Sequence, residues 1–117
     1  MELKDFNLEI VRFQKGNSTG YGIRPIEPCL INGQKYSRNP DNPSDENQYI
    51  PVSDLKNGCI IKMDAQKQAY ILQISQFFSV WYLDIWEIPY KNSDYSDQDK
   101  FEILREEKEP LESFEVK

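Results

Sequence analysis

Carboxylates dominate the reactive side chains of this sequence, because its 117 residues include 20 aspartates and glutamates but no histidine. Without histidine the chain lacks Ser-His-Asp or Cys-His activation of a nucleophile, an imidazole base and a histidine zinc ligand. Enzymatic chemistry would then need carboxylates, lysine, tyrosine or an oxygen-bound metal. We find no catalytic motif made of these groups and expect a protein that is not an enzyme.

Asp84 is the strongest single candidate for acid–base chemistry, because it interrupts an apolar stretch. Carboxylates that lie in apolar surroundings beside specific partners are often functional. The alternative is a structural carboxylate that accepts a hydrogen bond from a tyrosine, a tryptophan or free edge backbone. Because only Asp84 supports it, an enzymatic function is the weakest of the functional hypotheses.

Two oxygen-rich stretches, residues 41–47 and 93–99, contain ligand types that calcium takes. Neither has the glycine and the terminal glutamate of a calcium loop at the required positions. The two cysteines, Cys29 and Cys59, are too few for a structural zinc site or a disulfide framework. We expect no metal and no cofactor. Cys29 and Cys59 are predicted to be free thiols, or one disulfide if their strands are neighbours.

The acidity of the chain is concentrated at its C-terminal end. The net charge is −6, and residues 92–117 hold nine acids against four bases, so this segment carries −5 and the other 91 residues −1. Such a charge opposes nucleic-acid binding, which requires a lysine and arginine footprint. It suits docking on a basic protein, and the alternative is a solvated helix face that aids solubility.

Aromatic rings are concentrated in the segment 76–90, QFFSVWYLDIWEIPY, which holds six of them. They form either core or a surface that grips a partner, since tryptophan and tyrosine dominate binding hot spots. We take Trp86 and Tyr90 as candidate exposed anchors. An alternative function uses Trp81, Tyr82 and Trp86 to line the cleft of a β-barrel for a small molecule or sugar.

Alternating and apolar stretches predict antiparallel strands, with turns at polar, Gly- and Pro-containing segments. Asn32-Gly33 predicts a two-residue type I′ hairpin, and residues 37–48 a long loop. Residues 69–75 fit a strand or a helix, whereas 80–88 predict a strand that is apolar on both faces. The other expected strands are 6–13, 21–26, 29–36 with its hairpin, and 59–63.

The second face of the 80–88 strand needs a cover, for which we expect a helix at 97–109. Its apolar residues recur at three-four spacing through Leu104 and Leu111 to Phe114, and Pro110 should end it. We therefore expect one domain over residues 1–109, followed by an acidic tail, 110–117, whose composition is compatible with disorder. The fold class is mainly β (α+β): a small antiparallel sheet or partly open barrel of five to seven strands with one C-terminal helix.

These features predict a non-enzymatic, soluble and cytoplasmic protein-binding module, because no signal peptide or membrane span is present. More specifically, it would be an inhibitor or immunity-type protein that presents carboxylates to a basic target in place of nucleic-acid phosphates. We expect neither nucleic acid nor membrane as a direct partner. The candidate partner-binding residues are Asp94, Asp97, Asp99, Glu102, Glu106, Glu107, Trp86 and Tyr90.

Overall fold

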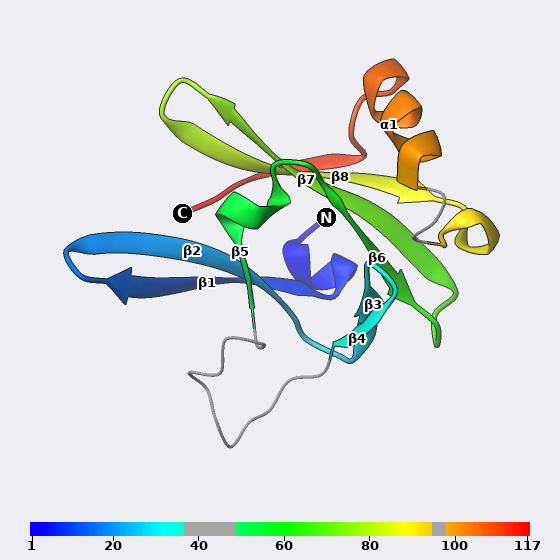
Figure 1. The fold of residues 1–117 in the computed structure, drawn as a ribbon, viewed down its shortest axis with the longest axis horizontal. Coiled ribbons are helices and arrows are strands. Elements are labelled where there is room, and N and C mark those ends of the chain that lie inside the picture. Colours follow the sequence, from blue (N-terminus) through cyan, green and yellow to red (C-terminus); the bar gives the residue numbers. More distant parts are fainter. Residues whose placement is uncertain (37–48, 95–97) are drawn as a thin grey trace.

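The computed structural model describes residues 1–36, 49–94 and 98–117, and these form two antiparallel sheets and one α-helix (Figure 1). The mainly β class with one C-terminal helix is therefore confirmed. The nine strands among the described residues exceed the expected five to seven, because several are very short. Their bounds are β1 Leu8–Lys15, β2 Ser18–Pro25, β3 Cys29–Ile31, β4 Gln34–Tyr36, β5 Ile50–Pro51, β6 Cys59–Met63, β7 Gln68–Phe77, β8 Val80–Ile88 and β9 Glu112–Glu115.

The larger sheet has six strands in the order β4-β3-β6-β7-β8-β9, and the smaller has three in the order β1-β2-β5. Within the described ranges they remain separate sheets and do not close into a barrel. Helix α1 (Gln98–Glu107) lies on the face of the large sheet that points away from the small sheet (Figure 1). The molecule is thus layered as helix, large sheet and small sheet.

The β7–β8 hairpin is the central element of the large sheet, with a continuous register from Ala69 opposite Ile88 to Phe77 opposite Val80. This pairing resolves the ambiguity over residues 69–75 in favour of a strand. β-Branched and aromatic residues suit a pleated surface that is covered on both sides. The expected strand 80–88 is confirmed with the same bounds.

The predicted two-residue hairpin connects β3 to β4. Asn32 and Gly33 both have positive φ, 50° and 79°, as a type I′ hairpin requires. The Asn32 side-chain oxygen also accepts a hydrogen bond from the Ile60 amide at 2.9 Å, which ties this hairpin to β6. The expected loop 37–48 lies outside the described residues.

The main core fills the space between the two sheets. Phe6, at the end of the 3-10 helix η1 (Leu3–Phe6), is fully buried, and its ring lies edge-on to Tyr70 at 5.1 Å and to Phe114 at 5.9 Å. Leu83 and Ile85 of β8 belong to this core, as their alternation predicts. A second, smaller core lies beneath α1 on the opposite face, where Leu104 packs against Ile60, Ala69, Ile71, Trp86 and Ile88.

The segment 110–117 is part of the fold, which corrects its description as a tail compatible with disorder. Residues Glu112–Glu115 form β9 and pair with β8 from Tyr82 to Ile85. Val116 is buried, and Phe114 packs against the main core. The helix ends at Glu107, before Pro110, and the chain then turns back along β8.

Both cysteines are buried free thiols, so the disulfide alternative is wrong. Burial raises the pKa of Cys29 to about 11. Burial, together with the nearby Cys29, raises the pKa of Cys59 to about 12. At neutral pH both thiols are protonated and unreactive, as small apolar residues of the core would be.

Candidate protein-binding surface

Trp86 is a core residue, which corrects its assignment as an exposed anchor. It is only 6% exposed and lies in the small core beneath α1. Its indole N–H donates a hydrogen bond to the backbone carbonyl of Lys108, at 3.0 Å. The Trp86 ring packs in the core beneath α1, and its indole N–H binds the backbone just after the helix. Both contacts fix the C-terminal end of α1 to the large sheet.

Tyr90 and Asp94 belong to a cluster of mixed charge that also contains Asp64, Lys62 and Lys67. The Tyr90 hydroxyl donates to Asp64, and this hydrogen bond raises the pKa of Tyr90. The ammonium groups of Lys62 and Lys67 lie 4.7 and 5.0 Å from the Tyr90 ring centroid, and Lys62 also pairs with Asp94 at 3.4 Å. Since cations offset both acids, this cluster does not extend the negative surface.

The exposed carboxylates of α1 form the negative surface, which we define as Glu102, Glu106 and Glu107. Glu102 lies 3.6 Å from Nη2 of Arg105, one turn along the helix. Glu106 and Glu107 make no ion pair within residues 1–36, 49–94 and 98–117. Asp97 lies outside the described residues, and of Asp99 only the backbone, within α1, is described.

Arg105 lies beside this surface and is nearly buried, because only 9% of its side chain is exposed. Its Nη1 atom is buried and has no hydrogen-bond partner in the described part of the chain. A depression of about 320 Å³ lies beside it, lined by Gln73 of β7 and by Glu102, Arg105 and Glu106 of α1. The helical acids therefore border a recess that reaches the outer face of the β7–β8 hairpin.

Two exposed aromatic residues were missed as site candidates. Phe77 and Phe78, at the tip of the β7–β8 hairpin, are 66% and 84% exposed, and their rings lie edge to face at 4.5 Å. The sequence holds a signal for this exposure, because polar Gln76 and Ser79 flank the pair. The density of apolar residues around them obscured it.

Asp84 has a structural hydrogen-bond partner, although it is a serine and not the tyrosine, tryptophan or free edge backbone that the alternative interpretation expected. The hydroxyl of Ser113 in β9 donates a hydrogen bond to Asp84 at 2.6 Å, across the β8–β9 pair. Gln73 lies opposite Asp84 on β7, but its amide donates to the carbonyl of Lys56, at 3.0 Å. No second acid or base accompanies Asp84 in these contacts, and a hydrogen bond between adjacent strands explains its position.

The three aromatics proposed for a ligand cleft do not line one cavity. Trp81 borders a groove of about 250 Å³ between the sheets, together with Phe13 and Tyr21, and the Lys56 ammonium lies 5.9 Å from its ring centroid. Trp86 lies in the small core on the other face of the large sheet, and Tyr82 shares that face by strand alternation. Only Trp81 remains a candidate for such a cleft.

Within the described residues, His, Cys, Asp and Glu nowhere gather in a group of three able to hold a metal ion. The same residues contain no helix that has the length and apolar character to cross a membrane. The chain matches no protein-family model, and comparison with curated proteins and with solved structures gives no significant match. The geometry and charge of the chain itself therefore carry the functional proposal.

Proposed function

We propose that this protein is a non-enzymatic binding module that presents the acidic face of α1 to a basic target protein. The observation that carries the proposal is the position of Glu102, Glu106 and Glu107, which are exposed on a helix fixed to the sheet. Leu104 and the Trp86–Lys108 hydrogen bond hold this helix in place. Carboxylates on a rigid element can complement a basic surface with little loss of conformational entropy on binding.

A fitting target is a protein whose basic groups otherwise contact phosphates, such as a nucleic-acid-binding protein or a nuclease. Carboxylates at a helical spacing would occupy positions of negative charge in such a channel. An inhibitor or immunity-type role follows from this mode of binding, because a channel occupied by α1 is closed to its nucleic acid. The charge distribution supports this choice, since the C-terminal segment carries −5 of the total charge of −6.

The test compares charge reversal on α1 with the same charge change elsewhere. One variant carries Glu102→Lys, Glu106→Lys and Glu107→Lys, and the control carries Glu27→Lys, Asp54→Lys and Glu87→Lys at exposed positions off the helix. Partners captured from an extract of the source cells are identified and purified, and Kd is measured at about 50 and about 300 mM NaCl. We expect a basic partner whose affinity falls with salt, and whose binding is lost by the helix variant alone.

A helix variant that binds with unchanged affinity and unchanged salt dependence contradicts the proposal. Substitution is preferable to truncation at Asn92, because truncation also removes β9 and uncovers the edge of β8. Unfolding in urea verifies that both variants stay folded.

A second candidate function rests on the groove beside Trp81. Its volume of about 250 Å³ lies below the roughly 300–1,000 Å³ of most small-molecule pockets. Phe13, Tyr21 and Trp81 with the Lys56 ammonium would suit a small planar anion. Chemical shifts of the Trp81 indole on addition of benzoate test this candidate, and unchanged shifts at millimolar benzoate would remove it.

A further inference from the structure

The exposed rings of Phe77 and Phe78 are unexplained by the fold. Phe78 and Ser79 form the two-residue loop between β7 and β8, and Phe78 has φ of +58°. Glycine or asparagine adopts this left-handed conformation with less strain than a bulky aromatic residue. Phenylalanine at position 78 therefore does not stabilise the hairpin turn. Its ring is 84% exposed, so packing within the molecule stabilises it little.

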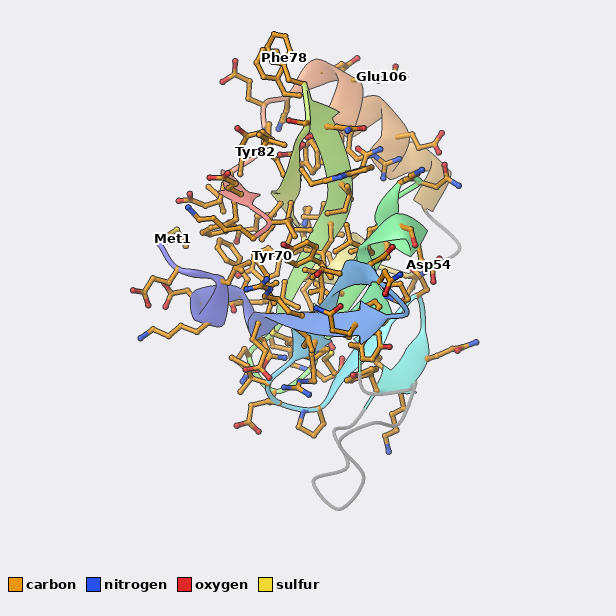
Figure 2. All side chains as sticks on the ribbon, turned by 90° about the vertical axis from the view of Figure 1, so that its left-hand side faces the viewer. Met1, Asp54, Tyr70, Phe78, Tyr82 and Glu106 are labelled. Atoms are coloured by element: carbon orange, nitrogen blue, oxygen red, sulfur yellow. The ribbon has the colours of Figure 1, made fainter. Side chains whose placement is uncertain are left out.

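Phe77 of the tip lies on the same face of β7 as the recess beside α1. Strand alternation places Gln73, Ser75 and Phe77 on the face of β7 that α1 covers lower down, at Ile71. Gln73 lines the recess together with Glu102 and Glu106. Phe77 lies four residues further, about 13 Å along an extended strand. Figure 2 accordingly shows Phe78 and Glu106 at the same end of the molecule.

Two acidic residues, Asp84 of β8 and Glu115 of β9, lie beside the path from the recess to the tip. Tyr82 lies between Ser75 of β7 and Glu115 of β9, and Asp84 lies between Gln73 and Ser113. Lys117 offsets Glu115 at 3.4 Å, and the nearly buried Arg105 offsets Glu102 at 3.6 Å. Asp84 and Glu106 make no ion pair within the described ranges, so they carry the negative charge of this border. An apolar tip with an acidic border is repelled by anionic membranes, whose surface attracts lysine and arginine. It complements a basic protein surface that contains an apolar pocket.

We infer that Phe77 and Phe78 are the apolar anchor of the interface whose charged part is α1, and that the partner is a basic protein with an apolar pocket beside its basic surface. This inference rests on the proposed function, and it specifies further that the basic partner has an apolar pocket. The aromatic pair would enter that pocket while Glu102 and Glu106 face the basic groups around it. Aromatic anchors in desolvated pockets typically dominate the binding energy of an interface.

The experiment places the photo-crosslinker p-benzoylphenylalanine at Phe78 in the full chain, with a control at the exposed Lys67 of the Tyr90 cluster. We expect irradiation in an extract of the source cells to join Phe78, but not Lys67, to one protein. The crosslinked peptide should border a pocket that lies beside lysine or arginine. With that protein purified, Phe77→Ser/Phe78→Ser should weaken binding by about 100-fold, as expected for two hot-spot residues. The remaining binding should keep the wild-type dependence on salt.

The outcomes separate this inference from the proposed function. If the Glu102/Glu106/Glu107 variant loses binding and the serine variant does not, α1 acts alone and the inference is overturned, while the proposed function stands. If only the serine variant loses binding, the proposed function fails, and with it the basic partner inferred here. A missing adduct at Phe78, or one far from any pocket, also overturns the inference.

The same serine variant tests two other binding partners of the tip, a membrane and a second copy of this chain. Sedimentation with vesicles of phosphatidylcholine, with and without phosphatidylserine, detects membrane binding. Analytical ultracentrifugation of the full chain detects self-association. Vesicle binding or a dimer that disappears in Phe77→Ser/Phe78→Ser overturns the inference in favour of a membrane or a second copy. Wild-type protein that is monomeric and free of vesicles supports it.

Discussion

Trp86 shows how one side chain links the helix to the large sheet. Its ring fills the small core beneath α1, and its indole N–H satisfies the carbonyl of Lys108, just beyond the last helical turn. A helix of ten residues is too short to be stable in water without such contacts. Trp86 thus positions the acidic surface without itself contacting a partner.

We expect Trp86→Phe to lower the free energy of unfolding by about 1–3 kcal/mol, because it removes a hydrogen bond and part of a buried ring. Urea titration followed by circular dichroism measures this change. Trp81→Phe is the matched control, since Trp81 is half-buried and makes no side-chain hydrogen bond in the described structure. Equal losses in the two variants would contradict the role assigned to the Trp86–Lys108 bond.

The two buried thiols should make stability depend on alkaline pH. Their pKa values are raised from 9.0 to about 11 for Cys29 and about 12 for Cys59. At pH values between 9.0 and these raised pKa values, the thiols of the unfolded chain lose their protons while those of the folded chain keep them. The free energy of unfolding therefore falls as pH rises above about 9. Below that pH the contribution is fully present.

Urea unfolding of wild type and of Cys29→Ala/Cys59→Ala, at pH about 8 and about 10, measures this dependence. The double variant should lose less stability between the two pH values. Tyr70 also has a pKa raised by burial, but it is present in both proteins and cancels in the comparison. Equal slopes would show that the thiols do not control the alkaline loss.

At the scale of elements, the backbone at Gly58, just before β6, packs closely against the Arg105 side chain of α1. It has φ of +84°, and a Cβ atom there would lie 2.9 Å from Nη1 of Arg105 and 3.3 Å from the carbonyl of Leu72. Gly16, with φ of +64°, has no atom within 4 Å of such a Cβ and provides a control for conformational strain alone.

We expect Gly16→Ala to cost about 1–2 kcal/mol, the strain of a left-handed residue, and Gly58→Ala to cost more. Adding Arg105→Ala to Gly58→Ala should remove part of the excess, because the displaced guanidinium is then absent. Thermal or urea unfolding of the variants measures these differences. Equal costs at Gly16 and Gly58 would contradict the close approach of Gly58 to Arg105 of α1.

Strands whose pattern is local were predictable, and β9 was not. The period of two in residues 80–88 and the Asn32-Gly33 pair determine their elements through neighbouring residues alone. In and just after β9, Phe114 and Val116 alternate with Ser113 and Glu115, but Phe114 also continues the helical spacing from Leu104. Two periodicities therefore compete there, and only pairing with β8, far away in sequence, selects the strand.

The acidic part of the candidate site was predictable, because it depends on composition. The exposure of its aromatic residues was not, because it depends on packing. The excess of acids after Asn92 identified the region that holds α1. Whether Trp86 or Phe78 is exposed depends on which side of β7–β8 the helix covers and how far along the hairpin it reaches. Six aromatic residues in one segment carry no information about that boundary.

At the scale of the whole molecule, the three layers should unfold together. The β7–β8 hairpin contributes to the main core through Leu83 and Ile85 and to the small core through Ile71 and Trp86, so neither core can open without the strands they share. Small domains with such shared elements commonly unfold in one cooperative transition. The two tryptophans report on the two regions separately, because Trp81 packs against the main core and Trp86 lies in the small one.

In Trp81→Phe the fluorescence reports only on Trp86 and the layer beneath α1, and in Trp86→Phe only on Trp81 and the space between the sheets. We expect the fluorescence and far-UV circular dichroism of each variant to give the same urea midpoint. If Trp86 fluorescence changed at lower urea than the circular dichroism of the same variant, α1 would detach before the sheets unfold. The acidic surface would then be a separately folding element, and its rigidity would not contribute to binding. Coincident transitions mean that the carboxylates of α1 and the Phe77–Phe78 tip are held by the same cooperative structure.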